Sequence, residues 1–305
     1  MNKNCRISSI VFLVFILAIG LITSCKSGKK PPQEDQEVKV PENVAEIKQD
    51  IDKATKIFNA LPSPLESAML IKSAGAEFDG KLLNPVSKQD NYVTRKSMAL
   101  NLGIYTCDLS FASLYEQTQL LIDYMNAAKK MADGLGILDA IKEEDINKLE
   151  ENINNSEVIM TVVSQTFMNS NSYLEDNGQP ATAATVLVGG WIEGLYLSTQ
   201  LVNMKEFNGN KLVSKIIDQK HSIDILIDLL NSSKGNPSID ELLPQVQSLK
   251  AVFDKINLTS SDVKAEYDAA SNTTMLKSEV KSDLSQETFL ELKKIVAEIR
   301  NSFVK

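Results

Sequence analysis

The sequence predicts an all-α protein, a multi-helix bundle of about eight to nine helices with little or no strand. Two observations predict this class. Apolar residues recur at spacings of three and four in several separate stretches of the 305-residue chain, which is the period of a helix that buries one face. Helix-breaking residues lie between these stretches, for example in Leu61-Pro-Ser-Pro64 and Asp176-Asn-Gly-Gln-Pro180.

The first 24 residues have the pattern of a bacterial lipoprotein signal peptide. Lys3 and Arg6 precede an uncharged, mostly apolar run whose serines and threonine make it marginal as a membrane span. The run ends in Ile22-Thr-Ser-Cys25, which resembles a lipobox. That resemblance implies cleavage before Cys25 and acylation of its sulfur, with palmitate as an acyl group. An uncleaved anchor or an ordinary secretory signal is the alternative.

Acylation would hold the protein on a membrane, because two or more acyl chains anchor a protein stably whereas one does so reversibly. We therefore expect a lipid-anchored protein of the bacterial cell envelope that contacts the membrane through its N-terminal acyl chains. The residue after the cysteine is Lys26, not the aspartate that retains lipoproteins of enteric bacteria in the inner membrane. This favours the outer membrane, and the choice between its periplasmic and surface faces stays open.

Residues 25–41 are predicted to form a lipidated flexible tether. They are polar, contain prolines and lack hydrophobic periodicity, which is typical of an extended linker. An all-α helical domain is expected over 42–305. The turn-rich stretch Asn208-Gly-Asn210 is a possible point of sub-division near residue 208.

Eight helices can be placed in this domain from their apolar stripes. In chain order they span 44–61, 94–109, 112–133, 156–174, 181–204, 210–231, 239–256 and 289–303. Ser238-Ile-Asp-Glu241 fits a capping box, and Leu284 before Ser285 is placed to pack on Phe289 as a hydrophobic staple. Pro244 predicts a kink or a later helix start, because proline deletes a helix hydrogen bond. Residues 272–280 are the strand candidate, as a hairpin arm or merely a loop.

Two of these helices are apolar nearly all round, which predicts that they are central. One contains Asp108 and the other contains Glu193, each among uncharged neighbours. Glycines in both helices leave room for another backbone, so we expect the two helices to pack near each other. The candidate ligand pocket consists of the two acids and nearby aromatic residues: Tyr105, Asp108, Trp191, Glu193 and Tyr196.

Two hypotheses explain the two acids. Asp108 and Glu193 could form a pair for acid–base chemistry, because burial and a second carboxylate both raise a carboxyl pKa. Alternatively, each acid is paired with a lysine, an arginine or a capping backbone group and has a structural role. The chain contains no phosphate-binding loop, nucleophile elbow or HExxH sequence, so no residue is assigned as catalytic and enzymatic activity stays open.

Charge and cysteine content exclude several functions. The chain has 32 basic and 40 acidic residues, and loss of the signal peptide removes two of the basic ones, so nucleic acid is not an expected partner. Cys5 leaves with the signal and Cys25 carries lipid, which leaves Cys107 without an intramolecular disulfide partner. Because His221 is the one histidine, we expect no closed zinc site, and no metal or cofactor is predicted.

Six motifs, taken together, carry a resemblance to a known family. They are Leu61-Pro-Ser-Pro64, Leu83-Asn-Pro85, Ala99-Leu-Asn-Leu-Gly-Ile-Tyr105, Cys107-Asp-Leu-Ser-Phe-Ala-Ser113, Met131-Ala-Asp-Gly-Leu-Gly136 and Gly189-Gly-Trp-Ile-Glu-Gly-Leu-Tyr196. This combination resembles a family of uncharacterised helical lipoproteins of Bacteroidetes-type bacteria, over most of residues 55–230. The resemblance implies a helical protein of the outer membrane and brings no established activity.

The leading functional hypothesis is a helical binding or scaffold module that engages an unknown envelope protein or a small ligand. The alternative is an envelope hydrolase or lyase that uses Asp108 and Glu193. An apolar cleft that contains both carboxylates within about 10 Å of each other would favour the enzyme.

Overall fold

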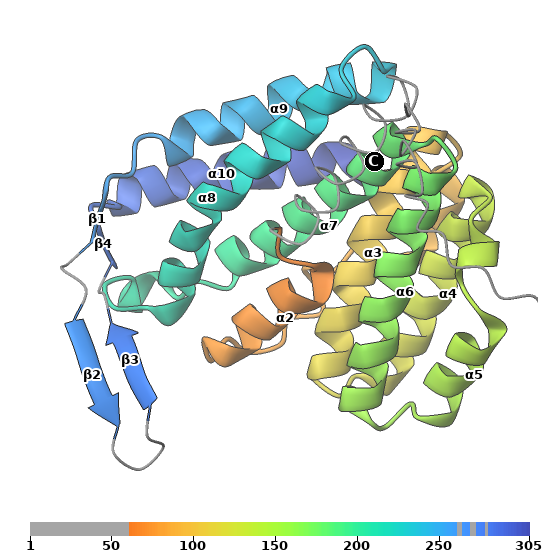
Figure 1. The fold of residues 1–305 in the computed structure, drawn as a ribbon, viewed down its shortest axis with the longest axis horizontal. Coiled ribbons are helices and arrows are strands. Elements are labelled where there is room, and N and C mark those ends of the chain that lie inside the picture. The colour runs from red at the N-terminus through yellow and green to blue at the C-terminus, as the bar shows by residue number, and fades with distance from the viewer. Residues whose placement is uncertain (1–60, 261–263, 269–272, 278–279) are drawn as a thin grey trace, which may run out of the picture. The chain divides into compact units, whose positions relative to one another are not determined.

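The computed structural model of the protein describes residues 61–260, 264–268, 273–277 and 280–305 (Figure 1). The predicted signal peptide, Cys25, the tether and nearly all of the first predicted helix lie outside the described residues. The part of the chain that is described confirms an all-α bundle. Its helices are α2 (Pro64–Ser73), α3 (Arg95–Leu114), α4 (Thr118–Leu135), α5 (Glu143–Glu151), α6 (Ser156–Asp176), α7 (Pro180–Gln200), α8 (Lys211–Ser232), α9 (Pro237–Phe253) and α10 (Gln286–Phe303).

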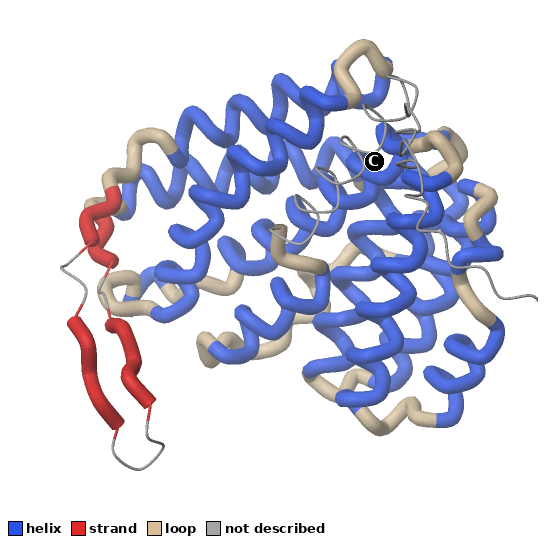
Figure 2. Tube along the Cα trace, in the orientation of Figure 1, coloured by secondary structure: helices blue, strands red, loops and turns tan. Residues whose placement is uncertain are grey.

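Strands occur between α9 and α10 (Figure 2). β1 (Leu258–Ser260) pairs antiparallel with β4 (Val280–Ser282), and β2 (Lys264–Asp268) pairs antiparallel with β3 (Thr273–Lys277). β3 falls within the predicted strand candidate 272–280, so the hairpin interpretation of that segment is confirmed over the residues described. Both ladders have two strands, and they leave the all-α class unchanged.

The break between α3 and α4 lies later than the sequence predicts. α3 continues to Leu114, and α4 begins at Thr118 instead of residue 112. Glu116 interrupts the helix because its φ of 58° is left-handed, and the Gln117 N–H donates back to the Ala112 carbonyl over 3.0 Å. α4 continues two residues past its predicted end at 133, to Leu135, and stops at a left-handed Gly136 with φ 73°.

The start of α9 corrects two predictions. The N-cap is Asn236, whose side chain accepts from the Ser238 N–H, so the capping box predicted at Ser238 does not form. Pro244 lies inside the helix, so the prediction that the helix starts only after Pro244 is wrong as well. Because Pro244 is exposed, the hydrogen bond it deletes lies where water can replace it. The predicted cap of α10 is confirmed, since Ser285 Oγ accepts from the Thr288 N–H.

Two short helices were missed by periodicity, which needs more turns than they contain. α2 starts in a capping box: Glu66 N–H donates to Ser63 Oγ over 3.2 Å, and Ser63 N–H donates to Glu66 Oε2 over 2.6 Å. α5 has nine residues, of which Leu149 alone is buried. Few apolar contacts therefore hold α5 to the rest of the domain.

Helix α7 contacts helices from both halves of the described chain. It packs on α3, α6 and α2, and also on α8 and α10, which Figure 1 shows on its other side. Residues from both sides of Asn208 belong to one buried apolar cluster. Phe207 packs against Phe289 of α10, for example, with ring centroids 5.2 Å apart.

The predicted close packing of the two apolar helices is confirmed at their glycines. A Cβ atom on Gly103 of α3 would lie 2.1 Å from the Val186 carbonyl oxygen of α7. A Cβ on Gly189 would likewise lie 2.1 Å from the Leu100 carbonyl oxygen. Only glycine permits backbones to approach this closely. Within the described residues, no helix combines the length and the apolar character needed to cross a bilayer.

Candidate functional site

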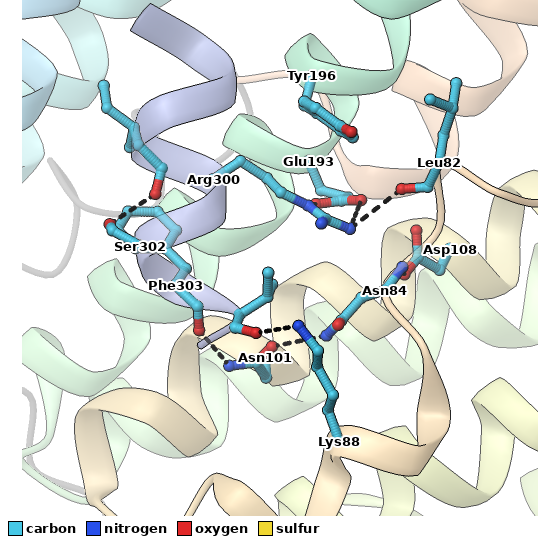
Figure 3. A network of polar contacts seen from close by, with 12 residues as sticks. Leu82, Asn84, Lys88, Asn101, Asp108, Glu193, Tyr196, Arg300, Ser302 and Phe303 are labelled. Carbon is cyan, nitrogen blue, oxygen red and sulfur yellow. Dashed lines mark hydrogen bonds and ion pairs between the residues drawn. The ribbon is translucent and has the colours of Figure 1, made fainter.

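The crossing of α3 and α7 brings the two predicted acids into one buried polar network. Asp108 and Glu193 each have 0% of their surface exposed. Arg300 of α10 reaches Glu193 with two hydrogen bonds, from Nε to Oε2 at 2.8 Å and from Nη2 to Oε1 at 3.0 Å (Figure 3). This bidentate geometry is the strong form of an arginine–carboxylate pair.

The Arg300 guanidinium is well satisfied. Burial by itself would lower the pKa of this group, but the charge and hydrogen bonds of Glu193 outweigh that effect and raise it. Nη2 also donates to the Leu82 carbonyl over 3.2 Å, and the guanidinium carbon lies 4.7 Å from the Tyr196 ring centroid. The cation is therefore held by a carboxylate, a carbonyl and an aromatic face.

Asp108 is the second carboxyl of this network, and its surroundings favour the protonated form. Burial raises the pKa of its carboxyl well above the usual range, the negative charge of Glu193 raises it further, and Arg300 opposes both. Oδ2 accepts from the Asn84 N–H over 3.0 Å, whereas buried Oδ1 has no donor directed at it. A proton on Oδ1 would resolve this, because a neutral carboxyl can donate to a nearby carboxylate such as that of Glu193.

The same network fixes the end of the chain to the domain. Asn101 Nδ2 donates to the Phe303 carbonyl over 3.0 Å, and Lys88 Nζ donates to the Val304 carbonyl over 2.8 Å (Figure 3). Asn84 Nδ2 donates to Asn101 Oδ1 over 2.9 Å, and the Asn84 N–H donates to Asp108. Asn84 therefore links the contacts of the last residues to the buried acids. The polar groups therefore hold α10 against α3 and α7.

The five residues predicted for a ligand pocket fall into separate groups of contacts. Glu193 and Tyr196 contact Arg300. Tyr105 lies in the adjacent aromatic cluster, 6.1 Å from Tyr92 and 5.9 Å from Tyr124 between ring centroids. Trp191 faces elsewhere: its Nε1–H donates to Gln219 of α8 over 3.1 Å. Both carboxyl groups are sealed from solvent: Glu193 pairs with Arg300, and Asp108 accepts from the Asn84 backbone N–H. Each acid therefore has a structural partner, as the second hypothesis expects.

Sequence reasoning missed Arg300, although a signal was present. Arg300 follows Val296 by four residues and precedes Phe303 by three, so it lies in the predicted apolar stripe of the last helix. A cation on such a stripe will be buried, and a buried cation is stable only when an anion pairs with it. Cys107, the cysteine left without a disulfide partner, is fully buried.

Replacing Asp108 by asparagine is expected to stabilise the protein at neutral pH. The folded protein holds a proton on Asp108 that the unfolded chain releases above a pKa of about 3.9. Its stability contribution is thus complete below that pH and falls as pH rises towards the elevated folded pKa. Asparagine mimics the neutral acid, so the variant should lack this decline when urea unfolding is followed from about pH 4 upwards. An unchanged pH dependence would contradict the protonated state.

A second site, absent from the sequence analysis, is a mostly apolar cavity between α3, α4, α5 and α6. Its volume is about 100 Å³. α3 contributes Leu102 and Leu109, α6 contributes Val163 and Phe167, and α5 contributes Leu149. Asn126, Lys129 and Glu150 line it as well and are exposed, so the cavity reaches the surface between α4 and α5.

Two residues that line the cavity each carry a buried polar atom without a hydrogen-bond partner. Asn171 is 3% exposed, and its Oδ1 receives no hydrogen bond; the buried Oγ1 of Thr166 also lacks one. Both residues line the cavity from α6. The other end of the Asn171 amide is fixed, because Nδ2 donates to Glu175 Oε1 over 3.1 Å. Buried polar atoms without a partner cost free energy.

No metal site emerges from the described residues, where no cluster of three or more His, Cys, Asp or Glu side chains is placed to hold an ion.

Comparison with known proteins identifies no family. No protein-family model matches the chain, and no solved structure matches it. A curated protein that does match is cytoplasmic dynein 2 heavy chain 1 of Caenorhabditis elegans, 25% identical over 257 residues. The match covers 83% of this chain but 5% of that protein. At this identity and coverage it assigns no role to the polar network or to the cavity.

Proposed function

We infer that the protein is a lipid-anchored binding module of the bacterial cell envelope, held on the outer membrane by acyl chains on Cys25. One observation carries the binding role: the apolar cavity that opens between α4 and α5. Ligand sites in proteins are typically concave and apolar with a few polar groups, and this cavity has that composition. The all-α domain serves as the rigid frame around it.

The polar network supports a structural role for Asp108 and Glu193. Neither carboxylate has exposed surface, and Glu193 is neutralised by Arg300. A hydrolase or lyase must bring its substrate into contact with its acid and base. The sealed arrangement therefore favours the binding module over the enzyme alternative, and moves the proposed ligand site from the acids to the cavity.

Anchoring is tested at the lipobox. The Cys25→Ser variant is expected to incorporate no labelled fatty acid and to move to the aqueous phase of a detergent separation, because the acylated sulfur is gone. Cys107→Ser is the matched control, since Cys107 is fully buried and should leave acylation intact. Acylation of the Cys25→Ser chain would rule out the proposed anchor.

Binding is tested with a small apolar probe, 4-fluorotoluene, followed by fluorine NMR on the full chain in lipid nanodiscs. Ala128→Phe should abolish the protein-dependent signal, because Ala128 lines the cavity and is half-buried, so that an aromatic ring there occupies the space. Gln119→Phe adds the same ring to an exposed position of the same helix and should retain binding. Equal signals from both variants would show that the probe only partitions into lipid.

A further inference from the structure

We propose that the cavity binds a small amphiphile with one unbranched alkyl chain and a primary ammonium head group. This inference rests on the binding role proposed above and specifies the ligand class of that same site. Three features of the cavity carry it: its apolar walls, its narrow shape and the charges at its opening.

The walls favour an apolar group inside the cavity. Each of the surrounding helices contributes apolar side chains, among them Leu102 of α3, Met125 of α4, Leu149 of α5 and Val163 of α6. Burial of a ligand's apolar surface here is favourable, and each buried methylene group strengthens binding roughly fourfold. A charged group inside the cavity would lose its hydration, so the head group must stay at the opening.

The shape of the cavity favours a chain over a ring. Its lining residues on α3 run from Leu102 to Leu109, which is about 10 Å along the helix axis at 1.5 Å per residue. Its volume is about 100 Å³, below the roughly 150 Å³ of an engineered apolar cavity in another protein that binds benzene. A cavity of this length and volume is narrow. One unbranched chain can therefore extend along it, whereas a ring enters only partly.

The charges at the opening favour an ammonium head group. Asp145 and Glu150 line the cavity from α5, and Lys129 lines it from α4. Lys129 and Glu150 are exposed and Asp145 is half-buried, so a head group in the opening can reach all three side chains. Among the described residues, neither of the two carboxylates is paired with a cation. Because α5 carries five acidic residues and one lysine in nine positions, the opening is negative overall and attracts a cation.

The test follows the methionine methyl groups by carbon NMR, on the full chain in phosphatidylcholine nanodiscs. Met125 lines the cavity, so its signal should shift when a ligand enters. Met168 of α6 is 40% exposed and does not line the cavity, so its signal reports non-specific contact with the probe. Ala128→Phe is the background for each probe, because the added ring occupies the cavity.

Water-soluble probes separate the head group from the chain. We expect hexylamine to bind roughly fivefold more tightly than hexanol, which is the upper range for an ion pair at an exposed site. Hexanoate should bind more weakly than hexanol, because its charge has the sign of the opening. Cyclohexylamine keeps the head group and closes the same carbons into a ring. It should bind roughly tenfold more weakly than hexylamine, since each methylene group left in water costs about fourfold.

Variants of α5 connect the preference for an amine to the opening. Asp145→Asn combined with Glu150→Gln should remove the preference for hexylamine over hexanol and leave hexanol binding unchanged. Glu143→Gln combined with Glu144→Gln is the matched control: it removes the same charge from exposed positions of the same helix that do not line the cavity. This control should retain most of the preference. None of the four positions is fully buried, so the variants are expected to fold.

The possible failures are distinguishable. Equal affinities for hexylamine, hexanol and hexanoate, all abolished by Ala128→Phe, would overturn the ammonium head group and leave the binding module standing. Cyclohexylamine binding as tight as that of hexylamine would overturn the unbranched chain in the same way. If no alkyl probe shifts Met125 while 4-fluorotoluene still binds, the ligand class is wrong and the binding role stands. If Ala128→Phe affects neither the alkyl probes nor 4-fluorotoluene, the ligand class and the binding site are both overturned.

Discussion

Replacing Arg300 by methionine is expected to destabilise the protein by about 3–5 kcal/mol, the range found when one partner of a buried ion pair is removed. Glu193 would stay fully buried without a cation, and the Leu82 carbonyl would lose its donor. Urea unfolding followed by circular dichroism measures the change. Because Arg300 holds α10 to α7, amide exchange in α10 should accelerate as well.

Two further variants show whether the ion pair is the cause. Lys294→Met removes a cation from the exposed face of the same helix, where its pair with Glu298 spans 3.9 Å, and should change stability by less than about 0.5 kcal/mol. Adding Glu193→Gln to Arg300→Met removes the stranded charge and should recover part of the loss. If the double variant is no more stable than Arg300→Met alone, the buried charge is not what destabilises it.

The second large effect is expected at the helix crossing, where Gly189→Ala should cost about 3 kcal/mol through overpacking. Alanine is the better helix former by about 1 kcal/mol, so propensity alone predicts the opposite sign. The new Cβ would lie 2.1 Å from the Leu100 carbonyl oxygen, which is backbone and cannot rotate away. The clash therefore outweighs the propensity, and thermal unfolding should show a lower midpoint.

Gly134→Ala supplies the control for this prediction. Its Cβ would also come close to another atom, 2.3 Å from Met98 Sδ, but that atom belongs to a flexible side chain that can move. Gly134 lies within α4, so the gain in helix propensity should make the substitution neutral or stabilising. Similar losses for the two variants would mean that the α3–α7 crossing is not uniquely tight.

Signals from near neighbours in the sequence account for most of what could be predicted. Helical periodicity, the cap at Ser285 and the left-handed glycine after α4 each depend on residues within about one or two turns, so they can be read from sequence alone. The errors are also local: α5 is too short for its stripe to be recognised, and Asn236 competes with Ser238 for the same cap. The central place of α3 and α7 followed from their lack of a polar face.

The two sites depend on residues that are far apart in the chain. Glu193 and Arg300 are separated by 107 positions, and no periodicity says which acid a buried arginine will meet. The cavity exists because four helices pack with a gap between them. Helix formation is a property of neighbouring residues, whereas the partners of a buried charge and the shape of a void depend on how whole helices pack, so only the tertiary structure decides them.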